Sequence, residues 1–157
     1  MRAVLQITEK ARLLCEGEVI STCGKGMCIL LGLEEGDTRE EADRFIEKIL
    51  NMRIFPDDKG KLNLCAVDVG ADILAVSNFT LCARLSSRRP DFMSAMKFAP
   101  AKELYEYFLA CMQSRADAYA AEGKKGAKIY PGVFGGDMKV EITGDGPITI
   151  WVTSEDL

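Results

Sequence analysis

The segment Ser77-Asn78-Phe79-Thr80-Leu81 places two hydroxyl groups, an amide and an aromatic ring at the end of an apolar run. Backbone N–H groups lose their ladder partners where a strand ends, so they can face a ligand carbonyl or a developing oxyanion. This pattern indicates chemistry at a carbonyl group. The alternative is a strand edge at which the β-branched Thr80 simply packs.

A second segment, Gly144-Asp145-Gly146-Pro147-Ile148-Thr149, sets a proline among glycines just before an apolar strand pattern. Bonds preceding proline are the ones that tolerate the cis form, which about 5–6% of them adopt in folded proteins. The segment is therefore a candidate for an unusual backbone conformation. The alternative is a plain hairpin turn.

The chain contains no histidine, and this excludes Ser-His-Asp, Cys-His and His-ligated metal mechanisms. An enzyme of this composition must rely on carboxylates, backbone amides, lysines, hydroxyls or the substrate itself. The six cysteines form no Cys-x-x-Cys pair, so zinc ribbons and thioredoxin-like motifs are not indicated. We predict reduced thiols, with Cys28 and Cys82 acting as small apolar side chains.

Glycine-rich phosphate loops are also not indicated. The turn Gly24-Lys25-Gly26 is too short for a nucleotide-binding loop, and no dinucleotide-binding glycine motif follows a strand. We therefore predict neither a metal nor a cofactor.

The net charge is −4, and such a chain cannot bind nucleic acid over its whole surface, because that binding relies on Lys and Arg displacing counterions from phosphates. A local basic patch can still do so. Two clusters offer such a patch, and the alternative for each is a solvated loop. They comprise Arg84, Arg88, Arg89 and Lys97, and then Lys124, Lys125 and Lys128.

The composition is 48% hydrophobic and 28% charged, which is ordinary for a globular protein and excludes disordered, collagen-like and disulfide-scaffold classes. The length of 157 residues predicts one domain over residues 1–157. The longest apolar runs, 27–33 and 73–76, are too short to span a bilayer, and no signal-peptide pattern follows Met1. We expect a cytoplasmic protein with no membrane partner.

The candidate segments must be positioned by a mixture of strands and helices. Residues 1–33 read as strands with a hairpin at Glu16-Gly17, and the apolar run 27–33 indicates a strand covered on both faces. Thr38 and Glu41 form a capping-box pattern at the start of a helix over 38–52. The remaining predicted elements are a strand over 71–81, a helix over 100–121, a connection over 124–136, and two closing strands, 138–142 and 148–152, that pair around residues 144–147.

Hairpins at both ends of the chain predict an α+β fold. We expect mainly antiparallel, barrel-like sheets with two principal helices.

Taken together, these segments resemble the D-aminoacyl-tRNA deacylase family, which hydrolyses D-amino acids, and often glycine, from mischarged tRNA. That family carries a Ser-Gln-x-Thr-Leu motif and an Asn-x-Gly-Pro-x-Thr motif, to which residues 77–81 and 144–149 correspond. The similarity extends in order through nearly the whole chain. It includes Glu16-Gly17-Glu18, Gly26 through Gly32, Arg53-Ile54-Phe55, Lys61-Leu62-Asn63-Leu64, Arg89-Pro90, Leu104-Tyr105-Glu106-Tyr107-Phe108 and Asp137-Met138.

The resemblance implies a homodimer with two sites at the subunit interface. The segment Gly146-Pro147, with a cis bond in the family, would reach with Thr149 into the site of the neighbouring subunit. Its main-chain carbonyls would hold the α-amino group of the substrate and exclude an L side chain. A rigid main-chain wall needs no side-chain contact to the amino acid, so it would serve many D-amino acids alike.

The resemblance also implies which residues form the reaction pocket and bind the RNA. Main-chain N–H groups near residues 79 and 80 would stabilise the oxyanion, and one such donor is worth about 10²–10³ in rate. The reaction would rely on the 2′-hydroxyl of the substrate rather than on an enzyme nucleophile. The implied catalytic residues are Ser77, Asn78, Phe79 and Thr80, and the implied contacts to the tRNA acceptor stem are Arg84, Arg88, Arg89 and Lys97.

Three positions depart from the family pattern. Asn78 replaces the usual Gln, Gly144 replaces the usual Asn, and Ile7 stands where the family has an Arg that helps to fix the Gly-Pro segment. Isoleucine donates no hydrogen bond. Three alternatives to D-aminoacyl-tRNA hydrolysis therefore stay open: a branch that edits a different mischarged tRNA, a non-catalytic tRNA-binding paralogue, and a structural dimer whose pocket is filled by side chains.

Overall fold

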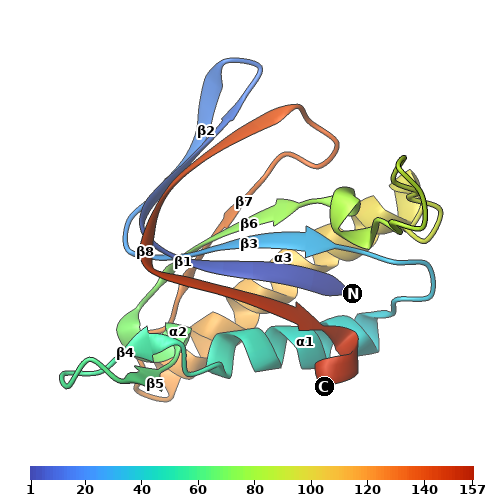
Figure 1. The fold of residues 1–157 in the computed structure, drawn as a ribbon. Coiled ribbons are helices and arrows are strands. Elements are labelled where there is room, and N and C mark those ends of the chain that lie inside the picture. Colours follow the sequence, from blue (N-terminus) through green and yellow to red (C-terminus); the bar gives the residue numbers. More distant parts are fainter.

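The computed structural model describes residues 1–157 and is drawn in Figure 1. Two long helices and a large curved sheet form most of the molecule. The strands are β1 (Arg2–Cys15), β2 (Glu18–Cys23), β3 (Gly26–Gly32), β4 (Phe55–Pro56), β5 (Leu62–Leu64), β6 (Asp72–Ser77), β7 (Lys128–Pro131) and β8 (Met138–Thr153). The α-helices are α1 (Arg39–Asn51), α2 (Ala66–Val69) and α3 (Phe98–Ala121), and the 3₁₀ helices are η1 (Phe79–Cys82) and η2 (Ser154–Asp156).

The main sheet has six strands, in the order β2-β1-β3-β6-β7, with β8 on the other side of β1. Strand β1 pairs antiparallel with β2, β3 and β8. The sheet is barrel-like, because β2 and the first part of β8 curl away from the face that α1 and α3 cover (Figure 1). This confirms the predicted α+β class with two principal helices. The sheet also contains two parallel pairs, β3–β6 and β6–β7, which the hairpin signals did not predict.

Hydrophobic residues fill both faces of the central strands. The larger core of 27 buried residues lies between the sheet and the helices, and it includes Met27, Ile29 and Leu31 of β3. A smaller core of six buried residues lies on the other face and includes Cys28 and Val76. Strand β3 is therefore covered on both faces, as its continuous apolar run predicts.

The two principal helices begin as local sequence signals require. The Thr38 side chain accepts a hydrogen bond from the Glu41 N–H, and the Glu41 carboxylate accepts one from the Thr38 N–H, so the predicted capping box is confirmed. Helix α3 begins at Phe98 rather than at Pro100. Pro100 still lies in the first turn, where an N–H has no intrahelical partner to lose. No helix is long and apolar enough to cross a membrane.

The predicted hairpin of 138–142 with 148–152 is wrong. Both stretches belong to the single 16-residue strand β8, and both pair with β1, with Val140 opposite Leu13 and Ile150 opposite Leu5. This is feasible because β1, at 14 residues, is long enough to accompany nearly all of β8. The Gly-Pro segment is a bulge within the ladder, since residues 145–148 lie opposite the single residue Ile7.

Two further predicted elements have different bounds. The strand expected over 71–81 ends at Ser77, and the chain then turns into η1. The Asn78 N–H still bonds to β3, donating to the Leu31 carbonyl at 2.7 Å. The connection expected over 124–136 contains β7, a short strand parallel to β6.

Candidate active site

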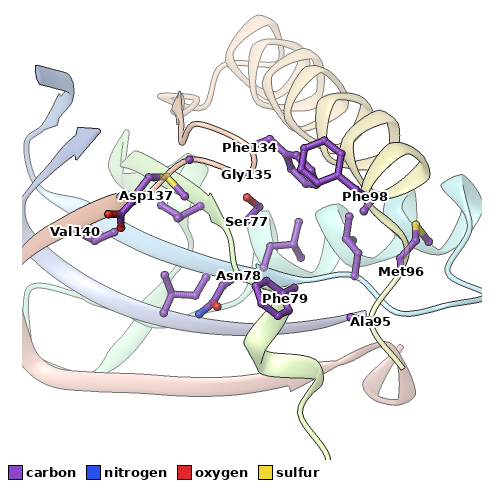
Figure 2. Close-up of a pocket in the computed structure, with 17 residues that line it drawn as sticks. Ser77, Asn78, Phe79, Ala95, Met96, Phe98, Phe134, Gly135, Asp137 and Val140 are labelled. Carbon is purple, nitrogen blue, oxygen red and sulfur yellow. The ribbon is translucent and has the colours of Figure 1, made fainter. Parts of the chain in front are cut away.

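A cavity of about 850 Å³ opens where β6 ends (Figure 2). One wall comprises the ends of β3 and β6 with η1, and the other comprises the start of α3 and the loop that leads into β8. Twelve of its 17 lining residues are hydrophobic. Its volume lies within the range of sites for small molecules, about 300–1,000 Å³. The cavity is open, so a pocket filled by side chains is not supported.

Three residues of the segment Ser77-Asn78-Phe79-Thr80-Leu81 line this cavity. Ser77 and Asn78 are half-buried in its wall, and Phe79 is an exposed residue that also lines it. Thr80 is exposed and does not line it. The Thr80 hydroxyl instead donates to Asn78 Oδ1 at 2.5 Å, so Thr80 is linked to the cavity through the Asn78 amide.

The start of η1 presents backbone donors beside this wall. The Leu81 N–H donates to the Asn78 carbonyl at 3.2 Å and is the first to bond within the turn. The N–H groups of Phe79 and Thr80 precede that bond, and no side chain caps them. Two adjacent N–H groups of this kind are the usual donors to an oxyanion.

Gly32 lies directly behind η1 and determines how closely η1 can approach β3. A Cβ at this position would lie 3.0 Å from Leu81 Cβ, 3.1 Å from Cys82 Sγ and 3.2 Å from the Asn78 carbonyl oxygen. These distances are shorter than ordinary van der Waals contacts. The placement of the Phe79 and Thr80 N–H groups therefore depends on a glycine at residue 32.

The opposite wall includes Phe134, Gly135 and Gly136, which the sequence analysis did not identify. Gly135 has a φ of +73°, and a Cβ there would lie 2.7 Å from the Phe98 ring. An aromatic residue followed by two glycines is the sequence signal from which this side of the cavity could have been predicted, because such a loop permits close approach to a ligand. Asp137 adds the one ionisable side chain of the lining.

The Gly-Pro segment, residues 144–149, does not line the cavity of its own chain. Gly146 and Pro147 are exposed, the peptide bond between them is cis, and Thr149 is also exposed, opposite Gln6. Asp145 is 3.8 Å from Lys25 Nζ. The structure of one chain therefore keeps Gly146-Pro147 apart from Ser77-Asn78-Phe79.

The Ile7 side chain is buried in the larger core, so it offers no polar group to the Gly-Pro segment. The two arginines on the same strand are engaged elsewhere. Arg2 Nε donates to Glu34 at 2.8 Å, and Arg12 Nη2 lies 2.7 Å from a Glu141 oxygen. Both arginines are thus paired with a carboxylate.

The four basic side chains predicted to bind RNA are all exposed, and none of them forms an ion pair. They are Arg84, Arg88, Arg89 and Lys97. Backbone bonds between Arg84 and Asp91 close the loop that carries Arg88 and Arg89, and Lys97 precedes α3. The second basic cluster is partly neutralised, because Lys124 lies 3.0 Å from Asp68.

Buried hydroxyl and thiol groups behind the cavity are poor nucleophiles. Burial raises the pKa of the Cys82 thiol to about 11 and that of Cys28 to about 12. Burial also raises the pKa of Tyr105 to about 12. The Tyr105 hydroxyl donates to the Ala75 carbonyl at 2.8 Å and accepts from the Gly132 N–H at 3.0 Å, so it braces the loop before β8. No group of three or more His, Cys, Asp or Glu side chains is placed to hold a metal ion.

A family model described as D-Tyr-tRNA(Tyr) deacylase matches residues 4–153. Among curated relatives, a D-aminoacyl-tRNA deacylase of Clostridium botulinum is 39% identical over 157 residues, covering 98% of this chain and 97% of the relative. One of Koribacter versatilis is 42% identical over 156 residues, covering 99% and 98%.

Two solved structures have the same fold. The c-Myc DNA Unwinding Element Binding Protein is 38% identical with a TM-score of 0.87, and the alignment covers 98% of each chain. A probable eukaryotic D-amino acid tRNA deacylase is 18% identical with a TM-score of 0.78, covering 96% of this chain and 97% of the other. At that identity, the second likeness concerns the fold alone.

Proposed function

Because this chain belongs to the D-aminoacyl-tRNA deacylase family, we propose that it hydrolyses the ester bond of D-aminoacyl-tRNA and releases the free D-amino acid and tRNA. The observation that carries this proposal is the cavity at the end of β6, with the N–H groups of Phe79 and Thr80 beside it. Those two N–H groups stabilise the oxyanion that forms when water adds to the ester carbonyl. Glycine esterified to tRNA is a further substrate, since it has no side chain to exclude.

The substrate supplies the group that the protein lacks. With no histidine in the chain, the 2′-hydroxyl of the terminal ribose orients the attacking water, and Ser77 and Asn78 hold the ester against the N–H groups. The bond between the carbonyl carbon and the ribose oxygen then breaks, and the ribose oxygen takes up a proton. An aminoacyl ester is already activated, so positioning and oxyanion donors are sufficient.

Selection of the D enantiomer comes from a second copy of the chain. The exposure of Gly146 and Pro147, and their separation from the cavity of their own chain, support a homodimer in which each segment completes the site of its partner. Main-chain carbonyls of Gly146 and Pro147 hold the α-amino group, and Thr149 supports them. An L side chain meets this backbone and is rejected on steric grounds.

The RNA itself is held by the free cations. Arg84, Arg88, Arg89 and Lys97 have no acidic partners to displace, so they can bind phosphates of the acceptor stem without breaking an ion pair. A few such contacts are enough for an acidic protein to bind RNA locally.

The test is hydrolysis of D-Tyr-tRNA and L-Tyr-tRNA by the purified protein in the presence of a chelator. We expect release of D-tyrosine, little release of L-tyrosine, and a dimer in light-scattering measurements on the same sample. Equal hydrolysis of both substrates, or of neither, contradicts the proposed reaction. A fully active monomer contradicts the shared site.

Thr80→Ala is expected to lower kcat by no more than about tenfold. The Thr80 hydroxyl donates to Asn78 Oδ1 and orients that amide, and one neutral hydrogen bond is worth about 0.5–1.5 kcal/mol. Single-turnover deacylation of D-Tyr-tRNA measures the effect, and Thr80→Ser, which keeps the hydroxyl, is the matched control. Abolished activity in the alanine variant with full activity in the serine variant would instead identify Thr80 as a nucleophile.

A second candidate is nucleic-acid binding without turnover. It is favoured by the free cations and by the 38% identical neighbour whose name records DNA binding. Binding of D-Tyr-tRNA without hydrolysis would establish it. Hydrolysis of another mischarged tRNA in preference to D-Tyr-tRNA would place the chain in an altered branch, for which Ile7, Asn78 and Gly144 are the candidate determinants.

A further inference from the structure

Four large apolar side chains are exposed between residues 79 and 98, the stretch of chain that runs from one wall of the cavity to the other. The exposed fractions are 60% for Phe79, 75% for Leu85, 87% for Met93 and 65% for Phe98. We call these residues the rim platform, because Phe79 and Phe98 both line the cavity while most of each ring stays open to solvent. Apolar side chains gathered in this way mark a binding surface rather than ordinary surface scatter.

The two rings of the rim platform are held rigidly. Phe79 meets Phe92 edge to face, with ring centres 5.2 Å apart and planes at 72°. Phe98 meets Phe134 in the same manner, at 5.1 Å and 70°. Figure 2 shows Phe98 against Phe134 on one side of the pocket and Phe79 on another. An edge-to-face contact holds a ring in place, and the high exposure of Phe79 and Phe98 leaves part of each ring available for stacking.

The basic side chains of the same stretch form no ion pair, and two carboxylates close to it accept hydrogen bonds from its backbone. Asp91 Oδ1 accepts from the Met93 N–H at 2.8 Å, and Glu35 Oε1 accepts from the Lys97 N–H at 3.3 Å. Arg88 and Arg89 lie in the loop between Leu85 and Met93 and form no ion pair. Exposed rings with adjacent unpaired cations are the combination that binds single-stranded nucleic acid.

We infer that the rim platform binds the unpaired nucleotides at the 3′ end of the RNA substrate, immediately before the aminoacylated nucleotide. One base stacks on Phe98 and the next contacts Met93 and Leu85, while Arg88 and Arg89 hold the phosphates where the unpaired nucleotides join the acceptor stem. This inference rests on the proposed function, since the terminal nucleoside must enter the cavity for its neighbours to cross the rim. Paired bases cannot stack here, because their faces are already covered by neighbouring base pairs.

The test measures binding rather than turnover. Two RNA minihelices with the sequence of an acceptor stem are compared, one with its unpaired 3′ nucleotides and one blunt-ended. We expect the wild-type protein to prefer the first. Phe98→Leu, which keeps an apolar side chain but removes the ring, is expected to weaken binding of the first by about 5- to 150-fold, the range for one stacked base, with no change for the blunt duplex.

Two further variants show that the effect is local and depends on stacking. Met93→Ala changes a residue that is almost fully exposed, so it preserves the fold and is expected to weaken binding of the same minihelix by severalfold. Leu62→Ala, on the distant β5, removes a comparably exposed apolar side chain and is expected to change nothing. Phe98→Leu should leave the salt dependence of binding unaltered, whereas removal of Arg88 and Arg89 should reduce the slope of log affinity against log salt by roughly 0.7–0.9 per lost phosphate contact.

The inference is overturned if the wild-type protein binds both minihelices equally, or if Phe98→Leu and Met93→Ala leave the preference intact. A wild-type protein that prefers unpaired ends through Phe98, yet hydrolyses no aminoacyl-tRNA, supports the inference and contradicts the proposed reaction. The two claims can therefore fail separately.

Discussion

Gly32→Ala is expected to lower kcat for D-aminoacyl-tRNA hydrolysis by about tenfold or more, although Gly32 itself is not a catalytic residue. The added Cβ would lie 3.0 Å from Leu81 Cβ and 3.2 Å from the Asn78 carbonyl oxygen. The 3₁₀ turn η1 must therefore move away from β3 and carry the Phe79 and Thr80 N–H groups with it. Displacement of about 1 Å in a catalytic group can cost about 10²-fold in rate, so a shift of a few tenths of an ångström is already felt.

The measurement is single-turnover deacylation, which isolates the chemical step from tRNA binding. Ile46→Val in α1 is the control for a general loss of stability. It lowers the free energy of unfolding by about 0.5–1.5 kcal/mol through the larger core, without touching η1. We expect the control to have normal kcat. An unchanged kcat in Gly32→Ala would mean that the N–H groups of η1 do not contribute to the reaction.

Gly26→Ala is expected to destabilise the whole fold by about 3–5 kcal/mol or more. Gly26 begins β3 and lies opposite Asp72 of the parallel strand β6. A Cβ at Gly26 would lie 1.9 Å from the Asp72 carbonyl oxygen and 2.7 Å from the Asp72 nitrogen. These are backbone atoms within the sheet, so they cannot rotate aside as a side chain would, and β3 must separate from β6.

Urea denaturation of Gly26→Ala and of its control, Gly24→Ala, measures this effect. A domain of this size typically has about 5–15 kcal/mol of unfolding free energy, so Gly26→Ala should have a much lower midpoint or fail to accumulate as folded protein. Gly24→Ala is the control, because its Cβ would lie 3.4 Å from Asp72 Oδ2, an ordinary contact. Equal midpoints for the two variants would show that β3 and β6 are not packed as described.

Features that depend on neighbouring residues could be predicted from the sequence. The capping box of Thr38 and Glu41 formed as predicted, because it needs only the first turn of its own helix. The apolar stripe of α1 and the two-sided burial of β3 followed from side-chain periodicity. The motif at residues 77–80 predicted a site at the end of a strand, and three of its residues do line the cavity, while their chemical roles stay predictions.

Features that depend on distant partners could not be predicted in this way. Alternating patterns at 138–142 and 148–152 indicate strands but carry no information about which strand each one joins. Pairing with β1 was decided by the tertiary structure, because β1 is long enough to accompany both stretches and their apolar side chains then pack against the two cores. For the same reason the sequence predicts only a connection where β7 forms, since this strand has four residues and weak alternation.

The sequence by itself determined the two principal helices, the buried strand and the family to which the chain belongs, since each depends on residue types at short or ordered spacing. Only the tertiary structure decided that Phe134 and Gly135 face Ser77 across one cavity, that Gly146-Pro147 lies outside it, and that Gly32 sets the position of η1. These relations join residues far apart in the chain, and they are set by close packing and strand register, which no local pattern encodes.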